Sequence, residues 1–269
     1  MSAEKARSSD AGDPWGDGKA AGPEVTGSYR DSHLGAAKAS DYDHGFWRRG
    51  TAKSIGWELE QRVLDLIWTR HLPTHPRRAI DFACGTGRVL EYLEHRVPET
   101  IGIDVSADML ELASRRATRS TLIQHDVTLG EPPGLRGDVD LVTAFRFLLN
   151  AEPALRSEAL GWLRSVLQPG GHLVANFHLN PTSLRGSYLR LRWRGRPVVA
   201  MLSVSQAESL LAAAGFTVVA CYGYEYLPYR RDGEQLIVPG LRRRLEHTLL
   251  DRSWLSRLGG CFVLVARVD

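Results

Sequence analysis

A glycine-rich turn between residues 79 and 88 carries the strongest chemical signal in the sequence. It reads Ala-Ile-Asp-Phe-Ala-Cys-Gly-Thr-Gly-Arg, an apolar run followed by a tight turn and then a helical stretch. Gly85 and Gly87 permit positive φ and close approach of a ligand to the backbone, while the helix start presents unpaired N–H groups. A dinucleotide-binding GxGxxG turn would need glycine where Leu90 stands, and Asp81 would repel a pyrophosphate. We therefore expect a ligand that carries an ammonium group.

Acidic residues close two further apolar runs. Asp104 ends the run Ile101-Gly-Ile-Asp, where a carboxylate can accept hydrogen bonds from both hydroxyls of a ribose. Ser106 follows as a good helix N-cap. Asp126 follows the next run.

The elements that position these residues alternate between short apolar runs and amphipathic helical stretches. The expected strands are 78–82, 100–104, 121–124, 139–145 and 172–177, and the helices between them are 88–95, 106–116 and 153–167. This alternation predicts βαβ crossovers and a parallel sheet covered on both faces. A helix over 204–214, a strand over 218–224, a basic helix over 241–255 and a last strand over 261–268 complete the prediction.

The composition predicts how the chain is divided. Residues 1–40 are poor in large apolar side chains and are expected to form a disordered leader. The remaining residues, 41–269, are expected to form one domain, in which an amphipathic helix over 54–70 acts as a cap. The segments 179–202 and 225–259 are expected as insertions on the substrate side, because long connections often carry binding residues. Within the second insertion, Arg242–Arg244 is interpreted as a solvated face.

Charge, cysteine content and hydropathy restrict the partners. The net charge is +3 and the pI about 8.8, below the threshold of about 9 that raises suspicion of nucleic-acid binding. No apolar run approaches the roughly 18 residues of a spanning helix, and the three cysteines are too scattered for a zinc site. We expect no nucleic-acid or membrane partner, no metal, and a cytoplasmic protein. Monomer and homodimer both stay open.

Taken in order, these motifs resemble those of the class I S-adenosylmethionine (SAM) dependent methyltransferases. Their first motif reads roughly Asp-x-Gly-x-Gly-x-Gly, which stands here as Asp81 to Gly87 with Ala83 in place of the first glycine. The resemblance covers residues 78–178. It implies an α/β fold: a Rossmann-like three-layer sandwich with a seven-stranded, mostly parallel sheet and an antiparallel last strand. It also implies SAM as cofactor and S-adenosyl-L-homocysteine (SAH) as product.

The same resemblance implies which residues hold the cofactor. The amino group of the methionine moiety is expected near Asp81 and the backbone of Ala83 and Gly85, and the ribose at Asp104. The remaining residues expected to contact the cofactor are Thr86, Gly87, Val105, Met109, Asp126, Val127, Phe145 and Tyr42. Of these, Val105 and Met109 are expected on the faces of the adenine. Asp126 is expected either to accept from the exocyclic amine of the adenine or to cap a turn. Tyr42 belongs to an aromatic segment that is expected to close over the cofactor.

Methyl transfer requires a positioned acceptor and, for a hydroxyl or ammonium acceptor, removal of a proton. Arg146 is expected at the rim of the cleft with Asn150, either paired with an acidic group on the acceptor or held in a structural ion pair. His178, at the end of the fifth strand, is the best-placed general base, although a lone histidine is more often structural. Tyrosines at 222, 224, 226 and 229 are expected either to build an aromatic acceptor pocket or to serve ordinary packing.

The predicted function is methyl transfer from SAM to oxygen, nitrogen or carbon of a small organic metabolite, as in secondary metabolism or sugar modification. The run Ala144-Phe-Arg-Phe147 differs from the Asn/Asp-Pro-Pro-Tyr/Phe motif of methyltransferases that act on exocyclic amines of DNA or on glutamine. Two alternatives stay open: an RNA or protein methyltransferase, and a SAM-binding regulator or partner subunit without catalysis.

Overall fold

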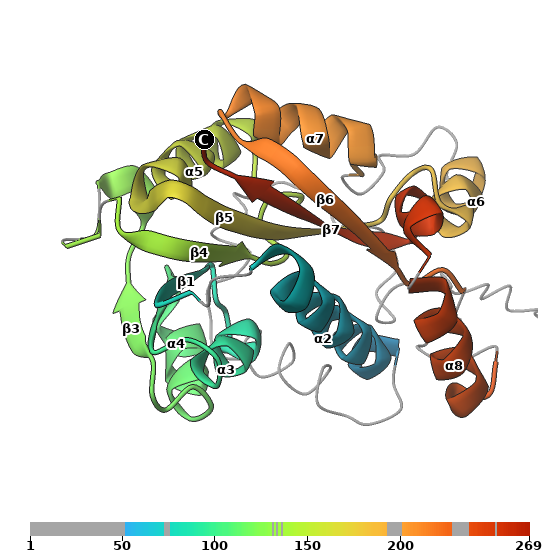
Figure 1. Cartoon of the computed structure of the whole chain (residues 1–269), viewed down its shortest axis with the longest axis horizontal. Coiled ribbons are helices and arrows are strands. Elements are labelled where there is room, and N and C mark those ends of the chain that lie inside the picture. The colour runs from blue at the N-terminus through green and yellow to red at the C-terminus, as the bar shows by residue number, and fades with distance from the viewer. Residues whose placement is uncertain are drawn as a thin grey trace, which may run out of the picture.

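The computed structural model describes residues 52–72, 76–130, 132, 134–135, 137–192, 201–227, 237–250 and 252–269. The expected leader over 1–40, Tyr42 with its aromatic segment, and Tyr229 lie outside these described residues. The described residues share one mixed sheet with helices on both of its faces (Figure 1).

The sheet has seven strands in the order β3-β2-β1-β4-β5-β7-β6 within the described residues. Strand β7 lies between β5 and β6 and is antiparallel to both, whereas the other neighbouring pairs are parallel. This arrangement confirms the predicted α/β fold with its antiparallel last strand. The strands are β1 Arg78–Phe82, β2 Glu99–Asp104, β3 Thr121–Gln124, β4 Val139–Ala144, β5 Leu167–His178, β6 Thr217–Tyr224 and β7 Cys261–Arg267.

Helices cover the sheet as two outer layers. Helices α2 and α3 and the end of α8 pack on one face, and α5 and α7 on the other, so that each face has its own apolar core. No helix in the described ranges combines the length and hydropathy needed to cross a bilayer. The helices are α2 Ala52–His71, α3 Arg88–Glu94, α4 Ala107–Ser114, α5 Pro153–Val166, α6 Leu184–Arg192, α7 Val204–Ala213 and α8 Pro239–Leu250, with 3₁₀ turns η2 Val127–Leu129 and η3 Ser253–Leu258.

The parallel register brings the sequence motifs to one edge of the sheet. Asp81 of β1 pairs with Gly102 of β2, and Asp104 pairs with Gln124 of β3. On the other side of β1, the end of β5 at His178 lies opposite Cys261 of β7. Since parallel strands point the same way, their carboxyl ends share an edge, where ligands of open α/β sheets bind.

Strand β5 starts earlier than expected, at Leu167 instead of residue 172. Val139 of β4 pairs with Leu167, and the next pair is Leu141 with His172, so the register shifts between them. Gly170 has φ 79, a conformation that favours glycine. The Pro-Gly-Gly turn therefore forms a bulge within the strand and not a loop before it.

The segment 179–202, expected as a connection, contains helix α6. Its start is held by Ser183, whose Oγ accepts a hydrogen bond from the N–H of Gly186 at 2.9 Å. A Cβ on Gly186 would lie 1.9 Å from the carbonyl oxygen of Asn180, so this helix requires glycine near its start. Glycine lowers helix propensity, which hid the helix from pattern analysis.

The basic helix expected over 241–255 is divided into α8 and η3. The N–H of Arg252 donates to the carbonyl oxygen of Leu249 at 3.0 Å, three residues back, which tightens the chain into a 3₁₀ turn. The interpretation of Arg242–Arg244 as a solvated face is wrong for Arg242, which is 1% exposed and lies against the carboxylate of Glu246. The guanidinium of Arg242 also donates to the carbonyl oxygen of Leu227. Arg242 is therefore on the face of α8 that packs against the core.

Two glycines in regular elements test the packing in opposite directions. A Cβ at Gly102 would lie 2.5 Å from Cδ2 of Leu90 and 2.9 Å from Cδ2 of Leu122. Gly102→Val should lower the free energy of unfolding by about 1–3 kcal/mol through overpacking. Gly161 on α5 has no atom within 4 Å of its Cβ position, so Gly161→Ala should raise it by about 1 kcal/mol. Urea unfolding of both variants checks the pair, and a stabilised Gly102→Val would contradict the packing.

Candidate functional site

A pocket opens where the carboxyl ends of β1, β2 and β4 meet the glycine turn, with the end of β5 on its wall. It brings together most of the residues that the sequence predicted: Asp81, Ala83, Gly85, Thr86, Asp104, Val105, Met109, Asp126, Val127, Phe145, Arg146 and His178. Gly87 is not among the lining residues. Asn150, Arg88 and Phe147 complete the wall beside Arg146. The cofactor-side and acceptor-side candidates therefore share one pocket.

The glycine turn takes the backbone conformation that its residues suggest. Gly85 has φ 54 and Gly87 has φ 81, and a Cβ on Gly87 would lie 3.0 Å from Ala113 of α4. Gly87 therefore shapes the turn from behind and does not face the pocket. Ala83 stands where the first motif of the similar methyltransferases has its first glycine. Its φ is 54, so its backbone is also in the left-handed conformation. An L-residue in this conformation costs about 1–2 kcal/mol.

Asp104 connects the glycine turn to the end of β2. Its Oδ2 accepts a hydrogen bond from the N–H of Gly85 at 2.8 Å, and its Oδ1 accepts one from the N–H of Ser106 at 2.9 Å. Ser106 in turn caps α4 by accepting from the N–H of Met109. A carboxylate oxygen has two lone pairs, so one that accepts from the backbone can also accept from a hydroxyl. The orientation of Asp104 is fixed before any ligand arrives.

Asp81 is a buried carboxyl at the floor of the pocket. It is 2% exposed, and Oγ1 of Thr143 donates to its Oδ1 at 2.6 Å. Burial raises the pKa of Asp81 to about 7 against the lowering effect of Thr143 and Arg88, and the charge of Asp104 adds to the rise. A cation placed beside Asp81 would relieve this cost, which suits an ammonium group.

The far side of the pocket is apolar apart from His125 and Asp126. Met109 is 3% exposed and, with Val105, lines the pocket next to Asp104. Oδ1 of Asp126 accepts hydrogen bonds from the N–H of Thr128 at 3.0 Å and from its hydroxyl at 2.8 Å, so Asp126 does cap a turn. Its contact with an adenine amine stays a prediction.

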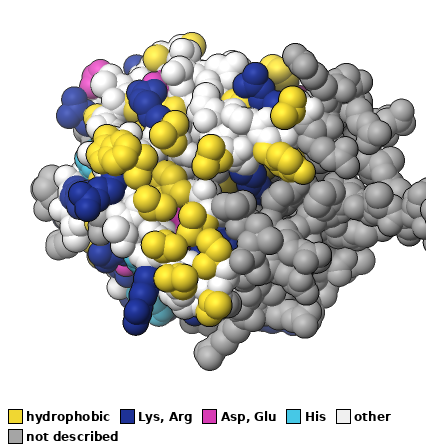
Figure 2. Space-filling view, turned by 90° about the vertical axis from the view of Figure 1, so that its right-hand side faces the viewer, with side chains coloured by type: hydrophobic (Ala, Val, Ile, Leu, Met, Phe, Trp, Pro, Cys, Tyr) yellow, Lys and Arg dark blue, Asp and Glu magenta, His cyan; other side chains and the backbone are white. Residues whose placement is uncertain are grey.

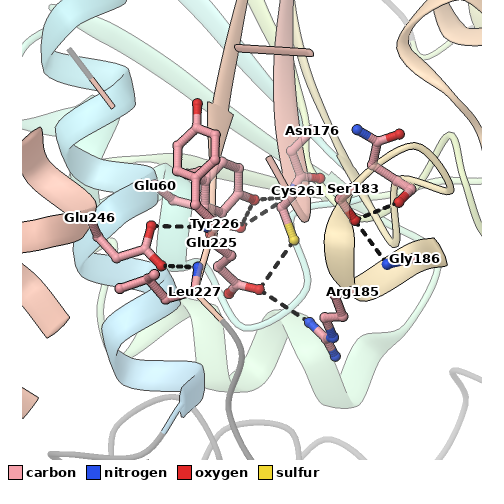
Figure 3. Close-up of polar contacts among 12 residues, drawn as sticks. Glu60, Asn176, Ser183, Arg185, Gly186, Glu225, Tyr226, Leu227, Glu246 and Cys261 are labelled. Carbon is pink, nitrogen blue, oxygen red and sulfur yellow. Dashed lines mark hydrogen bonds and ion pairs between the residues drawn. The ribbon is translucent and has the colours of Figure 1, made fainter. Parts of the chain in front are cut away.

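A fully buried carboxylate, Glu60 of α2, organises the acceptor side, and Figure 3 draws its contact with Asn176. It forms an ion pair with the guanidinium of Arg88, and its Oε1 lies 3.6 Å from the guanidinium of Arg146. The same Oε1 accepts from the hydroxyl of Tyr224 at 2.7 Å and from Nδ2 of Asn176 at 3.0 Å. Burial opposes ionisation, but the two arginines lower the pKa of Glu60 overall. The carboxylate is therefore charged and fully partnered.

Arg146 is held in a fixed position at the exit of β4. Its φ is 60, and its N–H donates to Oδ1 of Asn176, while Nδ2 of Asn150 donates to its carbonyl oxygen at 2.6 Å. The side chain is 28% exposed and lines the pocket. The structural ion pair considered for Arg146 is thus present, and the partly exposed guanidinium still faces the pocket. Its contact with an acceptor remains a prediction.

His178 lies on the acceptor side as well, and its imidazole is neutral. Burial and the charges of Arg146 and Arg185 lower its pKa to about 3, although Glu60 acts in the opposite direction. Its Nδ1 is buried and has no hydrogen-bond partner among the described residues. A buried nitrogen without a partner costs free energy, which a ligand group at this point would recover.

The tyrosines expected in an acceptor pocket are used for packing where they are described. Tyr222 shares a 2.8 Å hydrogen bond with Nε2 of His71, and Tyr224 is 1% exposed against Glu60. Neither they nor Tyr226 line the pocket. Beyond β6, Oε2 of Glu225 accepts from Sγ of Cys261 at 3.3 Å and lies 3.4 Å from the guanidinium of Arg185 (Figure 3). This side of the sheet is therefore closed by buried polar contacts.

Sequence reasoning missed Glu60 and the role of Arg88. Glu60 precedes Val63 and Ile67 at helical spacing, so it stands on the apolar stripe of α2, which was a usable signal. Arg88 is the last residue of the glycine-rich motif and was given no role. Its guanidinium lies 4.2 Å from the ring centroid of Trp57 on α2. No group of His, Cys, Asp and Glu suited to a metal ion occurs among the described residues.

Two glutamates on α2 provide a matched test of this network. Glu60→Ala leaves the buried guanidinium of Arg88 and the partly exposed guanidinium of Arg146 without their shared counter-charge. It should lower the free energy of unfolding by about 3–5 kcal/mol. Glu58 pairs with Arg243 while both side chains are about 40% exposed, so Glu58→Ala should cost less than about 1 kcal/mol. Urea unfolding measures both, and equal losses would contradict the central role of Glu60.

Comparison with known proteins identifies a methyltransferase domain in this chain. Residues 79–171 match the family described as Methyltransferase domain. A demethylmenaquinone methyltransferase from Thermus thermophilus is 29% identical over 199 residues, which cover 60% of this chain and 88% of that protein. An 18S rRNA (guanine-N(7))-methyltransferase from Arabidopsis thaliana is 34% identical over 167 residues, which cover 56% of this chain and 55% of that protein.

A solved structure shares the fold. The crystal structure of an N-methyltransferase from Bradyrhizobium japonicum in complex with SAH is similar with a TM-score of 0.58 and 14% identity, covering 90% of this chain and 100% of that one. The buried carboxyl of Asp81, the oriented carboxylate of Asp104 and the apolar wall suit the ammonium, ribose and adenine of SAM. The matched domain and the methyltransferase relatives support a class I SAM-dependent methyltransferase, and the solved structure agrees with its fold.

Proposed function

We propose that this methyltransferase acts on a small organic acceptor that carries an acidic group, and that residues 41–269 form its catalytic domain. The observation that carries the proposal is the partly exposed guanidinium of Arg146, which lines the same pocket as the cofactor residues. Arginine binds carboxylate and phosphate groups through paired N–H donors, so an anionic acceptor is the natural partner.

The cofactor residues are proposed to act as follows. Asp81 and the backbone of Ala83 and Gly85 hold the amino group, Asp104 accepts from the ribose hydroxyls, and Val105 and Met109 contact the adenine. When bound, SAM would supply a methyl group on a positively charged sulfur. A lone pair of the acceptor would bond to the methyl carbon while the carbon–sulfur bond breaks, which leaves SAH. The pocket mainly has to hold the acceptor in line, because positioning alone lowers the barrier of such a displacement substantially.

Arg146 and His178 are proposed to position the acceptor. Glu60, Asn176 and Asn150 fix Arg146, so its guanidinium can orient an anion without a large loss of side-chain entropy. His178 was expected to be a general base, but a pKa of about 3 makes the imidazole a weak proton acceptor. We propose instead that its buried ring nitrogen accepts a hydrogen bond from the acceptor's hydroxyl or amine and so points a lone pair toward the methyl group.

RNA is the main alternative acceptor, and the rRNA methyltransferase relative favours it. The net charge of +3 gives an RNA acceptor little support, because RNA binders usually carry a pronounced basic surface. A SAM-binding protein without catalysis remains the second alternative. The demethylmenaquinone methyltransferase relative is consistent with a small-molecule acceptor.

Asp81 gives a pH-dependent prediction for cofactor binding. Its pKa in the folded chain is about 7, above the ordinary value of 3.8, so the ligand-free protein should lose stability as pH rises from about 4 to about 7. The ionised form binds the ammonium group, so SAH affinity should rise between about pH 5.5 and 7.5. Asp81→Asn should abolish both trends and weaken SAH binding roughly tenfold at the higher pH. Asp138→Asn, at a 50% exposed residue paired with Arg78, is the control.

Calorimetric titration with SAH across this pH range, together with thermal unfolding, measures both effects. If Asp81→Asn keeps the pH dependence of the wild-type protein, another group holds the ammonium.

The acceptor class can be tested with SAM labelled on its methyl group. We expect label in products from a panel of carboxylate-bearing small molecules, and none above background in total RNA or in protein extract. For an acceptor found in this way, Arg146→Ala should raise KM more than about tenfold, since a charge-assisted pair is lost. The affinity for SAH should stay close to that of the wild type. Label in RNA alone would overturn the small-molecule proposal, and an unchanged KM would remove Arg146 from the acceptor site.

A further inference from the structure

Exposed apolar side chains gather at one end of the molecule. Within the described residues, most of the large apolar side chains that remain exposed lie on α6, on α8 with the residue before it, and on η3. These side chains are Leu184, Tyr188, Leu191, Val238, Leu241, Leu245, Trp254 and Leu258. Figure 2 shows hydrophobic side chains across this face with basic side chains beside them. We call these three segments the end surface.

Hydrogen bonds join the three segments into one surface. Nδ2 of Asn180 and the hydroxyl of Thr182, in the turn before α6, both donate to the carbonyl oxygen of Arg257 in η3, at 2.9 and 3.2 Å. The N–H of Arg252 donates to the carbonyl oxygen of Leu249, so η3 continues directly from α8. The apolar side chains are therefore held together by the fold.

The charges on the end surface are positive. Arg190, Arg244 and Arg252 are exposed and form no ion pair within the described residues. Arg243 and Arg257 pair with Glu58 of α2 and Glu208 of α7. Among the described residues of the three segments themselves, the one acidic side chain, Glu246, is fully buried. The surface thus combines leucines and a tryptophan with arginines.

We propose that the end surface docks the protein on an anionic lipid bilayer. Apolar side chains with tryptophan, surrounded by arginine, are typical of structures that lie in the membrane interface. Anionic headgroups attract arginines near the surface, and the leucines and Trp254 enter the boundary of the acyl chains. The arginines of the end surface thus match the anionic headgroups, and its apolar side chains match the boundary of the acyl chains.

Other occupants fit the same residues less well. In a symmetric contact between two copies the same surface meets itself, so Arg190, Arg244 and Arg252 would face like charges. RNA recognition relies on aromatic or planar groups that stack on bases, whereas most of the exposed apolar side chains here are leucines.

A surface of this kind leaves no long apolar run in the sequence. The expectation of no membrane partner rested on the absence of a spanning segment, and the segments found here are short and separated by other elements. Docking on one leaflet needs only side chains that the fold assembles. None of the exposed apolar residues of the end surface lines the cofactor pocket, so the inference does not rest on the proposed acceptor.

Sedimentation of the full chain with lipid vesicles tests the proposal. We expect binding to vesicles of phosphatidylglycerol and phosphatidylcholine in equal parts, weaker binding at high salt, and roughly tenfold weaker binding to phosphatidylcholine alone. Trp254→Ser with Leu258→Ser should reduce binding to the anionic vesicles about tenfold or more by removing buried apolar area. Arg244→Glu with Arg252→Glu should reduce it by a similar factor.

Leu129→Ser is the matched control, because Leu129 is 83% exposed and lies in η2, away from the end surface. It should sediment with vesicles like the wild type. SAH affinity and melting temperature should not change in any of these variants, which separates loss of docking from loss of fold.

Failure of the wild type to bind the anionic vesicles, or equal binding by the double variants, would overturn the proposal. A wild-type dimer that Trp254→Ser with Leu258→Ser converts to a monomer would assign the end surface to self-association instead. RNA retention that the apolar double variant loses would assign it to RNA.

Discussion

The buried carboxylate of Glu60 connects the cap helix to the rest of the site. One side chain on α2 binds Arg88 from the helix after the glycine turn, Arg146 from the exit of β4, and the polar groups of Asn176 and Tyr224 from β5 and β6. A charge in this position is tolerable only because it is fully partnered. The guanidinium of Arg88 depends on it more directly than that of Arg146, which lies 3.6 Å away and is 28% exposed. The cap helix and the sheet edge are therefore coupled by electrostatics as well as by apolar packing.

The carboxyl ends of the strands carry acidic groups on the cofactor side of the pocket and a basic group on the acceptor side. This separation of charge fits a methyl transfer. Asp81 and Asp104 face the part of the pocket where the cofactor's ammonium and ribose are proposed to lie, while Arg146 and neutral His178 line the acceptor side. Because the strands are parallel, each of these groups comes from the carboxyl end of its own strand or from the two residues after it. The fold provides the separation, and the side chains provide the sign of the charge at each point.

The sequence predicted the sheet and most of the cofactor side because those signals are local. The glycine turn and the acids at strand ends can be recognised from a few neighbouring residues. It did not predict the partners of Arg146, since Glu60 is 86 positions away and charged residues on helices are usually solvated. The helix around Gly186 was missed because its glycine is required by contact with the backbone of Asn180. The end surface was missed because three short segments form it only in the fold.

A crystal structure of the full chain with SAH tests the central claim most directly. The account predicts that the ribose hydroxyls bind Asp104 and that the amino group lies at Asp81. It further predicts that the sulfur faces the side of the pocket formed by Arg146 and His178. SAH bound elsewhere, or bound in this pocket with its sulfur turned away from Arg146 and His178, would contradict the account.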